Sequence, residues 1–397
     1  MRRMAAVILA LGLLAAGCST SEPAGRNADG SRASNTEPPR LRVEEVADGF
    51  TNAWDVGFLP DGKVLLTQRP GRISLLSSAR HGASVSPVRA DLSDIFAEGE
   101  GGLMGLAVHP DFASSREFTT CQTHTENGRP KDIRLVTWRL ADNGRSARRV
   151  ADPLLGGLPI NPSGRHSGCQ PALGPDGSLL VGTGDTATAN VAQNRHSLGG
   201  KLLRLNLKTG KPLPDNPFAH SANRNERYVY SYGHRNVQGV AVRPGTDVVY
   251  TAEQGPDDDD EVNRSVAGAN YGWDPSQGGR VSGYDENVPM TDLGRFPHAV
   301  RAVWSSGNPT EATSGSTFLS GQRWGAWNGA LAVSALKGSK LLLLRLRKNG
   351  SLRDVAVPAA LNGKYGRLRA AVLGPDDALY VTTSNSGDDK LLRVTPS

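Results

Sequence analysis

The residues best suited to acid–base chemistry in this chain lie in glycine-rich loops. His166 stands within Gly164-Arg165-His166-Ser167-Gly168, and Asp185 follows Gly184 at the end of the next apolar stretch. A histidine titrates near neutral pH and can accept a proton from a bound ligand, while a carboxylate can hold its second ring nitrogen. The two residues are therefore candidates for a general base and its partner. Residue type alone leaves a merely solvated loop histidine open as well.

Other residues are suited to binding an anion. Arg235 and Asn236 lie between apolar stretches, where a planar guanidinium and an amide can bind a carboxylate or carbonyl ligand. Arg367 and Arg369 are two residues apart, so in an extended segment they face the same side. Together with Lys337 they make up to four cations, which suit a multiply charged anion. Without such a ligand, carboxylates or water must match these charges.

An acidic run follows Glu253-Gln254-Gly255-Pro256. It places five carboxylates in succession, from Asp257 to Glu261, and these repel one another unless a cation binds. Oxygen ligands of this kind, helped by loop carbonyls, suit Ca²⁺, although the spacing of an EF-hand loop is missing. Charge alone favours a solvated acidic turn, so both explanations stay open.

Short β-favourable runs separated by tight turns must position these loops. Proline presets φ at the first turn position, and Asp and Gly tolerate the conformations that follow, so each such turn predicts a hairpin. Six turns recur: Leu59-Pro60-Asp61-Gly62, His109-Pro110-Asp111-Phe112, Gly174-Pro175-Asp176-Gly177, Arg243-Pro244-Gly245-Thr246, Trp327-Asn328-Gly329 and Gly374-Pro375-Asp376-Asp377. The pattern predicts an all-β fold, a six-bladed β-propeller of four-stranded antiparallel blades. A multi-sheet sandwich is the alternative.

The first forty residues predict export. Residues 1–17 have a basic start, an apolar run too short to span a bilayer and small residues before Cys18, which is typical of a lipoprotein signal peptide. An ordinary signal peptide with an incidental cysteine is the alternative. Residues 18–40 predict a flexible tether, and residues 41–397 the propeller. The expected location is the outer face of the cell membrane, held by lipid on Cys18.

Composition limits the remaining choices. The formal net charge of the 397 residues is +6 and is not concentrated in one basic run, so nucleic acid is not an expected partner. If Cys18 carries lipid, Cys121 and Cys169 remain, and outside the cytoplasm they form either one disulfide or two buried thiols.

Several segments, in this order, resemble the soluble-type PQQ-dependent glucose/sorbosone dehydrogenases, also called aldose sugar dehydrogenases, a family of six-bladed propellers. The resemblance runs from Trp54 to the C-terminus. Its markers are Gly99-Glu100-Gly101-Gly102-Leu103-Met104-Gly105-Leu106-Ala107, Gly200-Lys201-Leu202-Leu203-Arg204-Leu205, Asp215-Asn216-Pro217-Phe218, Tyr232-Gly233-His234-Arg235-Asn236, Glu253-Gln254-Gly255-Pro256 and Asn270-Tyr271-Gly272-Trp273.

The resemblance implies catalytic roles. His166 matches the general base that takes the proton from the sugar's anomeric hydroxyl as hydride passes to the quinone, and Asp185 matches the carboxylate that orients it. Arg235 matches the cation beside the reacting quinone oxygen, and Asn236 its neighbour on the cofactor. Lys337, Arg367 and Arg369 match basic contacts of the cofactor. Glu100 lies where a cofactor-contacting glutamine is often found, and Trp304 loosely matches an aromatic that stacks on the ring system.

The resemblance also implies two calcium sites. Gly255 and Pro256 match positions whose main-chain carbonyls hold the Ca²⁺ of the cofactor, which acts as a Lewis acid on the quinone. Glu261, with the backbone at Tyr271 and help from Asp260, resembles a second, structural Ca²⁺ site.

The chain departs from the family after the base. The family usually continues Gly-Gly-Arg-Leu or Ser-Gly-Arg-Leu, whereas here Ser167-Gly168-Cys169-Gln170-Pro171 follows His166. In addition, Val237 replaces the usual Pro. Both changes bear on substrate geometry more than on cofactor binding, because the cationic set is intact.

The sequence thus predicts a membrane-tethered, PQQ- and Ca²⁺-dependent oxidation of an aldose sugar to its lactone. The alternatives are a non-catalytic envelope propeller that binds glycan or protein, and a Ca²⁺-dependent, lactonase-like hydrolase. The sugar, the electron acceptor and a homodimer are left open.

Overall fold

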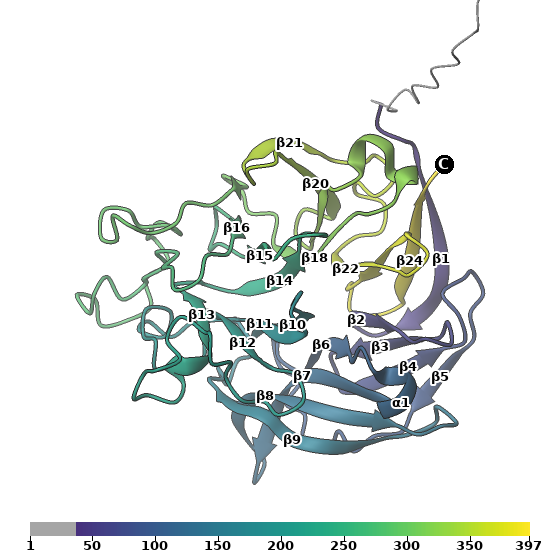
Figure 1. Ribbon diagram of the computed structural model, residues 1–397, viewed down its shortest axis with the longest axis horizontal. Helices are drawn as coiled ribbons and strands as arrows, with labels where there is room; N and C mark the ends of the chain where they lie inside the picture. The colour runs from purple at the N-terminus through teal and green to yellow at the C-terminus, as the bar shows by residue number, and fades with distance from the viewer. Residues whose placement is uncertain (1–36) are drawn as a thin grey trace, which may run out of the picture.

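The computed structural model describes residues 37–397, and these form six four-stranded antiparallel sheets arranged around a central axis (Figure 1). The predicted all-β, six-bladed propeller is confirmed. Helical structure in this part of the chain is limited to α1 (Phe112–Ser115) and two 3₁₀ turns, η1 (Glu226–Tyr228) and η2 (Gln322–Trp327).

The sheets are named blades 1 to 6 in chain order, and in blades 1 to 5 the strands follow one another from the axis outward. Blade 1 contains β2 (Ala53–Phe58), β3 (Val64–Gln68), β4 (Arg72–Leu76) and β5 (Val85–Val88), blade 2 contains β6 (Leu103–Val108), β7 (Glu117–Glu126), β8 (Arg129–Leu140) and β9 (Ala147–Leu158), and blade 3 contains β10 (Gly168–Leu173), β11 (Ser178–Thr183), β12 (Lys201–Asn206) and β13 (Val229–Tyr232). Blade 4 contains β14 (Val237–Val242), β15 (Val249–Glu253), β16 (Glu261–Arg264) and β17 (Trp304–Ser305), and blade 5 contains β18 (Thr313–Phe318), β19 (Leu331–Ala335), β20 (Lys340–Leu346) and β21 (Leu352–Ala356).

Blade 6 closes the ring with strands from both ends of the described chain. It contains β22 (Leu368–Leu373), β23 (Leu379–Thr383), β24 (Asp389–Pro396) and, outermost, β1 (Leu41–Phe50). The antiparallel ladder between β1 and β24 begins at Leu41, opposite Pro396, and ends at Phe50, opposite Asp389. Because the inner strands β2, β6, β10, β14, β18 and β22 contact one another around the axis, only short edges remain exposed.

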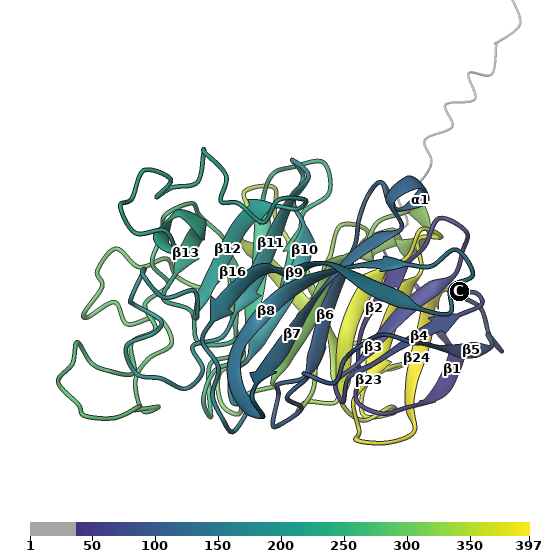
Figure 2. The ribbon, with the colours of Figure 1, turned by 90° about the horizontal axis from the view of Figure 1, so that it is seen from below.

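All six turns that the sequence singled out connect the first strand of a blade to its second. In three of them a hydrogen bond closes the turn from the fourth residue to the first, from Gly62 to Leu59, from Gly177 to Gly174 and from Asp377 to Gly374. The turns therefore gather at one end of the ring, the turn end, which also carries α1 (Figure 2). The segments before the first strands and after the second strands lie at the other end, the loop end.

The core is divided among the blade interfaces. Six hydrophobic clusters each fill the space between two neighbouring sheets, and the one between blades 2 and 3 contains Met104, Cys121, Cys169, Leu179 and Leu203. Every blade thus buries both faces, which explains why the inner strands are almost continuously buried.

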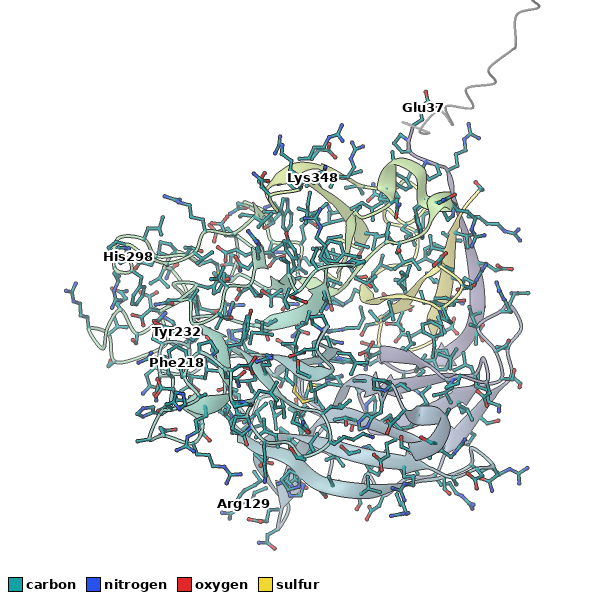
Figure 3. All side chains as sticks on the ribbon, in the orientation of Figure 1. Glu37, Arg129, Phe218, Tyr232, His298 and Lys348 are labelled. Carbon is teal, nitrogen blue, oxygen red and sulfur yellow. A yellow bond between two sulfur atoms is a disulfide. The ribbon has the colours of Figure 1, made fainter. Side chains whose placement is uncertain are left out.

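The two cysteines left open by the sequence form a disulfide. Cys121 on β7 is bonded to Cys169 on β10, with their Cα atoms 5.9 Å apart, and the bond is visible in yellow near the centre of the ring (Figure 3).

The expected signal peptide and Cys18 lie outside the described residues, as does most of the tether. Within residues 37–397, no helix has the length and apolar character needed to cross a membrane.

Candidate functional site

The loop end collects most of the residues that the sequence singled out. His166, Arg235 and Arg367 each lie just before the first strand of a blade, and Asp185 and Lys337 follow second strands. They come from blades 3 to 6 but reach the same mouth of the ring, because each inner strand starts there. The fold therefore explains how residues scattered over more than 200 positions of sequence converge.

His166 and Asp185 form a buried pair. Nδ1 of His166 lies 2.8 Å from Oδ1 of Asp185, and the two residues are 4% and 0% exposed. Asp185 also accepts a hydrogen bond from the backbone N–H of Ala187 at 2.8 Å. Since the carboxylate takes the proton on Nδ1, Nε2 is the ring nitrogen left to accept a proton from a ligand.

Two aromatic residues that the sequence did not assign to the site support this pair. Trp273 Nε1 and the Tyr284 hydroxyl each donate to Oδ2 of Asp185 at 2.7 Å. The Tyr284 oxygen is also 3.2 Å from Nδ1 of His166. Burial, followed by the charge of Asp185, raises the pKa of Tyr284, so its phenol remains a donor at neutral pH. Trp273 belonged to a recognised motif, but Tyr284 lies in a loop with no local signal.

Close backbone packing fixes the loop around His166. A Cβ on Gly164 would lie 1.7 Å from the carbonyl oxygen of Glu98, and a Cβ on Gly184 would lie 1.9 Å from that of His166. Only glycine fits at either position. The glycines of this loop thus allow two neighbouring segments to approach the histidine from both sides.

Glu100 connects the base to the next blade. Its carboxylate accepts hydrogen bonds from the His166 backbone N–H at 3.3 Å and from the side-chain amides of Asn236 and Gln238, both at 2.9 Å. Asn236 in turn accepts from the backbone N–H of Gly168 at 3.1 Å. The predicted site residues Glu100 and Asn236 therefore lie in one hydrogen-bond network with His166.

Arg235 lies on the opposite side of the pair. Its guanidinium donates to the carbonyl of Gln254 at 2.9 Å, lies over the ring of Trp273 and forms an ion pair with Glu286. The other oxygen of Glu286 binds Arg165 at 2.9 Å. Glu286, like Tyr284, had no sequence signal, and it carries the only carboxylate that pairs with Arg235 in the described chain.

Arg369 is a buried cation without a carboxylate partner among residues 37–397. Its guanidinium stacks over Trp54 at 3.9 Å from the ring centroid and donates to Gln238 at 2.8 Å. Its Nε has no hydrogen-bond partner in the described part of the chain. Burial lowers the pKa of Arg369 to about 9, and the nearby cations Arg367 and Arg69 add to this effect.

Arg369 also forms the floor of the site. Beneath it, a cavity of about 240 Å³ runs along the axis and is lined by all six inner strands. Lys337 and Arg367 are exposed at the rim, and neither forms an ion pair within the described residues. Lys337 donates to the Thr310 hydroxyl at 3.2 Å. Arg69, which the sequence did not single out, adds a further cation close to Arg369. Positive charge thus exceeds negative charge here.

The acidic loop is organised around Asp260. One oxygen of this buried carboxylate accepts the N–H of Gly255 at 2.9 Å, and the other accepts those of Glu311 at 2.8 Å and Thr313 at 3.1 Å. Burial raises the pKa of Asp260 to about 6. The carbonyls of Gly255 and Pro256 accept no hydrogen bond from the described chain, so they remain able to bind a cation.

Glu261 lies deeper in the same blade. Its carboxylate accepts hydrogen bonds from Thr291 at 2.8 Å and from Asn263 at 3.2 Å, and Asn263 also binds Glu253. Burial, and then the charge of Glu253, raises the pKa of Glu261 to about 8. Tyr271 lies near this network, with its ring stacked on His234, which itself contacts Glu253 at 2.7 Å.

Side chains alone do not provide a metal centre in residues 37–397. No group of three or more His, Cys, Asp or Glu residues in this range is arranged to hold a metal ion. A cation at either predicted calcium site would therefore depend on main-chain carbonyls.

Trp304 is not brought together with the other residues. It lies on β17, the outermost strand of blade 4, and is half-buried against the hydrophobic cluster between blades 4 and 5. The aromatic rings that the structure does place beside the buried pair and Arg369 are those of Trp273, Tyr284 and Trp54.

Comparisons with known proteins agree with this geometry. The family described as Glucose / Sorbosone dehydrogenase matches residues 50–393. An aldose sugar dehydrogenase of Escherichia coli (strain K12) is 28% identical over 366 residues, which cover 90% of this chain and 94% of that protein.

Two solved structures are similar over nearly the whole propeller. A glucose dehydrogenase from Thermus thermophilus is 37% identical, with a TM-score of 0.73 over 89% of this chain and 99% of that one. The PQQ-bound form of an aldose sugar dehydrogenase from Streptomyces coelicolor is 29% identical, with a TM-score of 0.70 over 90% of this chain and 99% of that one.

Proposed function

Because the chain belongs to the glucose/sorbosone dehydrogenase family, we propose that it is a PQQ- and Ca²⁺-dependent enzyme that oxidises an aldose sugar. The product is the lactone, formed by oxidation at the anomeric carbon. The electrons then pass to an acceptor outside the protein.

The observation that carries this proposal is the unmatched positive charge beside the His166–Asp185 pair. A buried guanidinium without a carboxylate is unfavourable unless a ligand supplies the missing charge. Arg369 is in this situation, its Nε is unpartnered in the described chain, and Arg367 and Lys337 add exposed cations. PQQ carries three carboxylates, so it fits this charge. A hydrolase or a simple binding protein has no need of such a cluster next to a base.

The residues of the chain supply the acid–base part of the reaction. His166 would accept the proton of the anomeric hydroxyl at Nε2, while Asp185 holds Nδ1–H at 2.8 Å and stabilises the imidazolium that forms. Arg235 provides positive charge near the same place, where a donor can stabilise a developing oxyanion. When bound, PQQ supplies the electrophilic carbonyl carbon that accepts hydride from the anomeric carbon.

The loop at Gly255 and Pro256 is suited to the calcium of the cofactor. Its two carbonyls are free of hydrogen bonds within the described residues, and Asp260 holds the loop in shape through three backbone N–H groups. Carbonyl oxygens are good Ca²⁺ ligands. A second Ca²⁺ beside Glu261 and the backbone at Tyr271 would take the place of the proton that burial favours on Glu261.

The direct test is reconstitution. Purified apo-protein is titrated with PQQ in the presence of Ca²⁺, followed by the absorbance of the quinone, and dye reduction is then measured with a panel of aldoses. We expect saturable binding, sugar-dependent reduction and loss of both after chelation of Ca²⁺. A quinone spectrum that is unchanged by the protein would refute the proposal.

Two variants separate the roles of the residues. His166→Gln should bind PQQ normally but reduce dye at least 100-fold more slowly, because the proton acceptor is lost. Arg367→Gln should weaken PQQ binding, whereas Arg353→Gln, on the outermost strand of blade 5, is the matched control and should not. Equal effects of the two arginine substitutions would contradict the assignment.

We further propose that the protein is exported and held at the outer face of the cell membrane through lipid on Cys18. Metabolic labelling with a fatty acid, compared between wild type and Cys18→Ser, tests this location.

A further inference from the structure

The backbone on either side of His166 adopts a conformation that side chains disfavour. The angle φ is +48° at His166, +58° at Gly168 and +70° at Cys169. In this left-handed region the Cβ atom crowds the following carbonyl, so His166 and Cys169 are strained whereas Gly168 is not. Strain of this kind persists only where the surrounding structure holds the backbone in place.

His166 itself is held by neighbouring segments. Its carbonyl accepts the N–H of Thr186 at 3.3 Å, and its own N–H donates to Glu100. These contacts end before Cys169, so they leave the second strained residue to be fixed by something else.

The sheet does not fix Cys169 either. In the ladder between β10 and β11, Gly168 is opposite Thr183 and Gln170 is opposite Gly182, so Cys169 is the extra residue of a β-bulge. A bulged residue is left without a cross-strand partner.

The disulfide connects this bulge to a rigid anchor. Cys121 lies within the ten-residue strand β7, opposite Leu135, and β7 is paired on both sides, with β6 and β8. Both cysteines are fully buried in the hydrophobic cluster between blades 2 and 3. The cross-link therefore ties the unpaired residue three positions after His166 to the interior of the neighbouring blade.

We propose that the Cys121–Cys169 disulfide is a brace that keeps His166 aimed, so that both cysteines are positioning residues for the His166–Asp185 pair. The catalytic part of this inference rests on the proposed function. Without the brace, the bulge relaxes toward an unstrained backbone and carries His166 away from its position against Asp185. A displacement of about 1 Å at a reacting group lowers turnover by roughly 100-fold.

Two double variants separate the cross-link from the strain. Cys121→Ala with Cys169→Ala removes the disulfide but keeps a side chain at φ +70°, whereas Cys121→Ala with Cys169→Gly removes both. Glycine adopts this conformation freely, so the bulge can keep its shape. We expect kcat to fall about 10- to 100-fold in the alanine variant and to recover most of that loss in the glycine variant, with PQQ affinity within about twofold of wild type in both.

A matched control excludes a general loss of stability. Leu179→Ala opens a cavity in the same hydrophobic cluster without touching the bulge, and it should lower the thermal midpoint yet leave kcat unchanged. If the alanine double variant keeps its kcat, or if Leu179→Ala loses as much, the brace is refuted.

A second readout does not depend on activity. In apo-protein labelled with ¹⁵N-histidine, the Nδ1–H signal of His166, assigned by its loss in His166→Gln, reports the hydrogen bond to Asp185. We expect this signal to disappear through exchange with water in the alanine variant and to persist in the glycine variant. An unchanged signal in the alanine variant overturns the inference, and it does so even if wild type fails to bind PQQ, a result that would refute the proposed function instead.

Discussion

Replacing Arg369 with methionine should stabilise the apo-protein and weaken cofactor binding at the same time. Burial lowers the pKa of this guanidinium from 12.5 to about 9. At about 1.36 kcal/mol per pKa unit, this corresponds to on the order of 5 kcal/mol against the charged form. Because the pKa is lowered in the folded state, this penalty applies at every pH below about 9, including neutral pH.

Favourable contacts of Arg369 offset much of this penalty. The stacking on Trp54 contributes about 2 kcal/mol and the hydrogen bonds to Gln238 and Ser314 about 1 kcal/mol each. Methionine has a similar length and no charge, so Arg369→Met should raise the free energy of unfolding of the apo-protein by about 1 kcal/mol. Loss of a charge-assisted contact should lower PQQ affinity by about 2–3 kcal/mol, or roughly 30- to 150-fold.

The assay combines denaturant unfolding of the apo-protein with PQQ titration. Arg393→Met is the matched control, because Arg393 is similarly buried but paired with Asp376 at 2.8 Å and Glu44 at 3.4 Å. That variant should lose about 1–3 kcal/mol of stability and keep its PQQ affinity. If Arg369→Met destabilises the apo-protein as much as Arg393→Met does, and binds PQQ like wild type, the reasoning is wrong.

Three further outcomes follow from other contacts. Tyr284→Phe removes a hydroxyl that donates to Asp185 at 2.7 Å, so kcat should fall about tenfold and the acidic limb of the kcat/KM profile should move to higher pH, with unchanged PQQ affinity; an unaltered profile would count against a role for Tyr284. Glu286→Gln removes the carboxylate paired with Arg235, so equilibrium titration should show PQQ binding several-fold tighter, and weaker binding would contradict the charge argument. Burial raises the pKa of Asp55 from 3.8 to about 6, so its contribution to stability is fully present below pH 3.8 and is lost as the pH rises through about 6, a change of about 3 kcal/mol. Unfolding free energies of wild type relative to Asp55→Asn should fall by that order between about pH 4 and pH 7, and parallel curves would show that Asp55 does not titrate as described.

The fold could be predicted because its signals are local. A turn such as Gly174-Pro175-Asp176-Gly177 carries its own conformational preference, and six such turns mark the inner hairpins of six blades. His166 and Asp185 could be paired because they flank one inner hairpin, β10 and β11, and so must meet at its open end.

The missing parts of the site depend on contacts between distant segments. Tyr284 and Glu286 lie about 100 and 50 residues from Asp185 and Arg235, in a loop with no repeating pattern, so only the closed ring shows that they meet. The disulfide was undecidable for the same reason, since Cys121 and Cys169 are 48 residues apart on different blades. Trp304 was matched by a loose alignment alone, and its place on an outer strand follows from strand order, which local sequence does not fix.

The closure of blade 6 also determines which way the molecule faces. Leu41 pairs with Pro396 at the turn end, whereas Phe50 pairs with Asp389 at the loop end. The polypeptide therefore enters the ring from the side opposite the mouth of the site. A protein anchored through its N-terminal segment would stand with its back to the membrane and its mouth toward the surroundings, where sugars and soluble electron carriers arrive by diffusion.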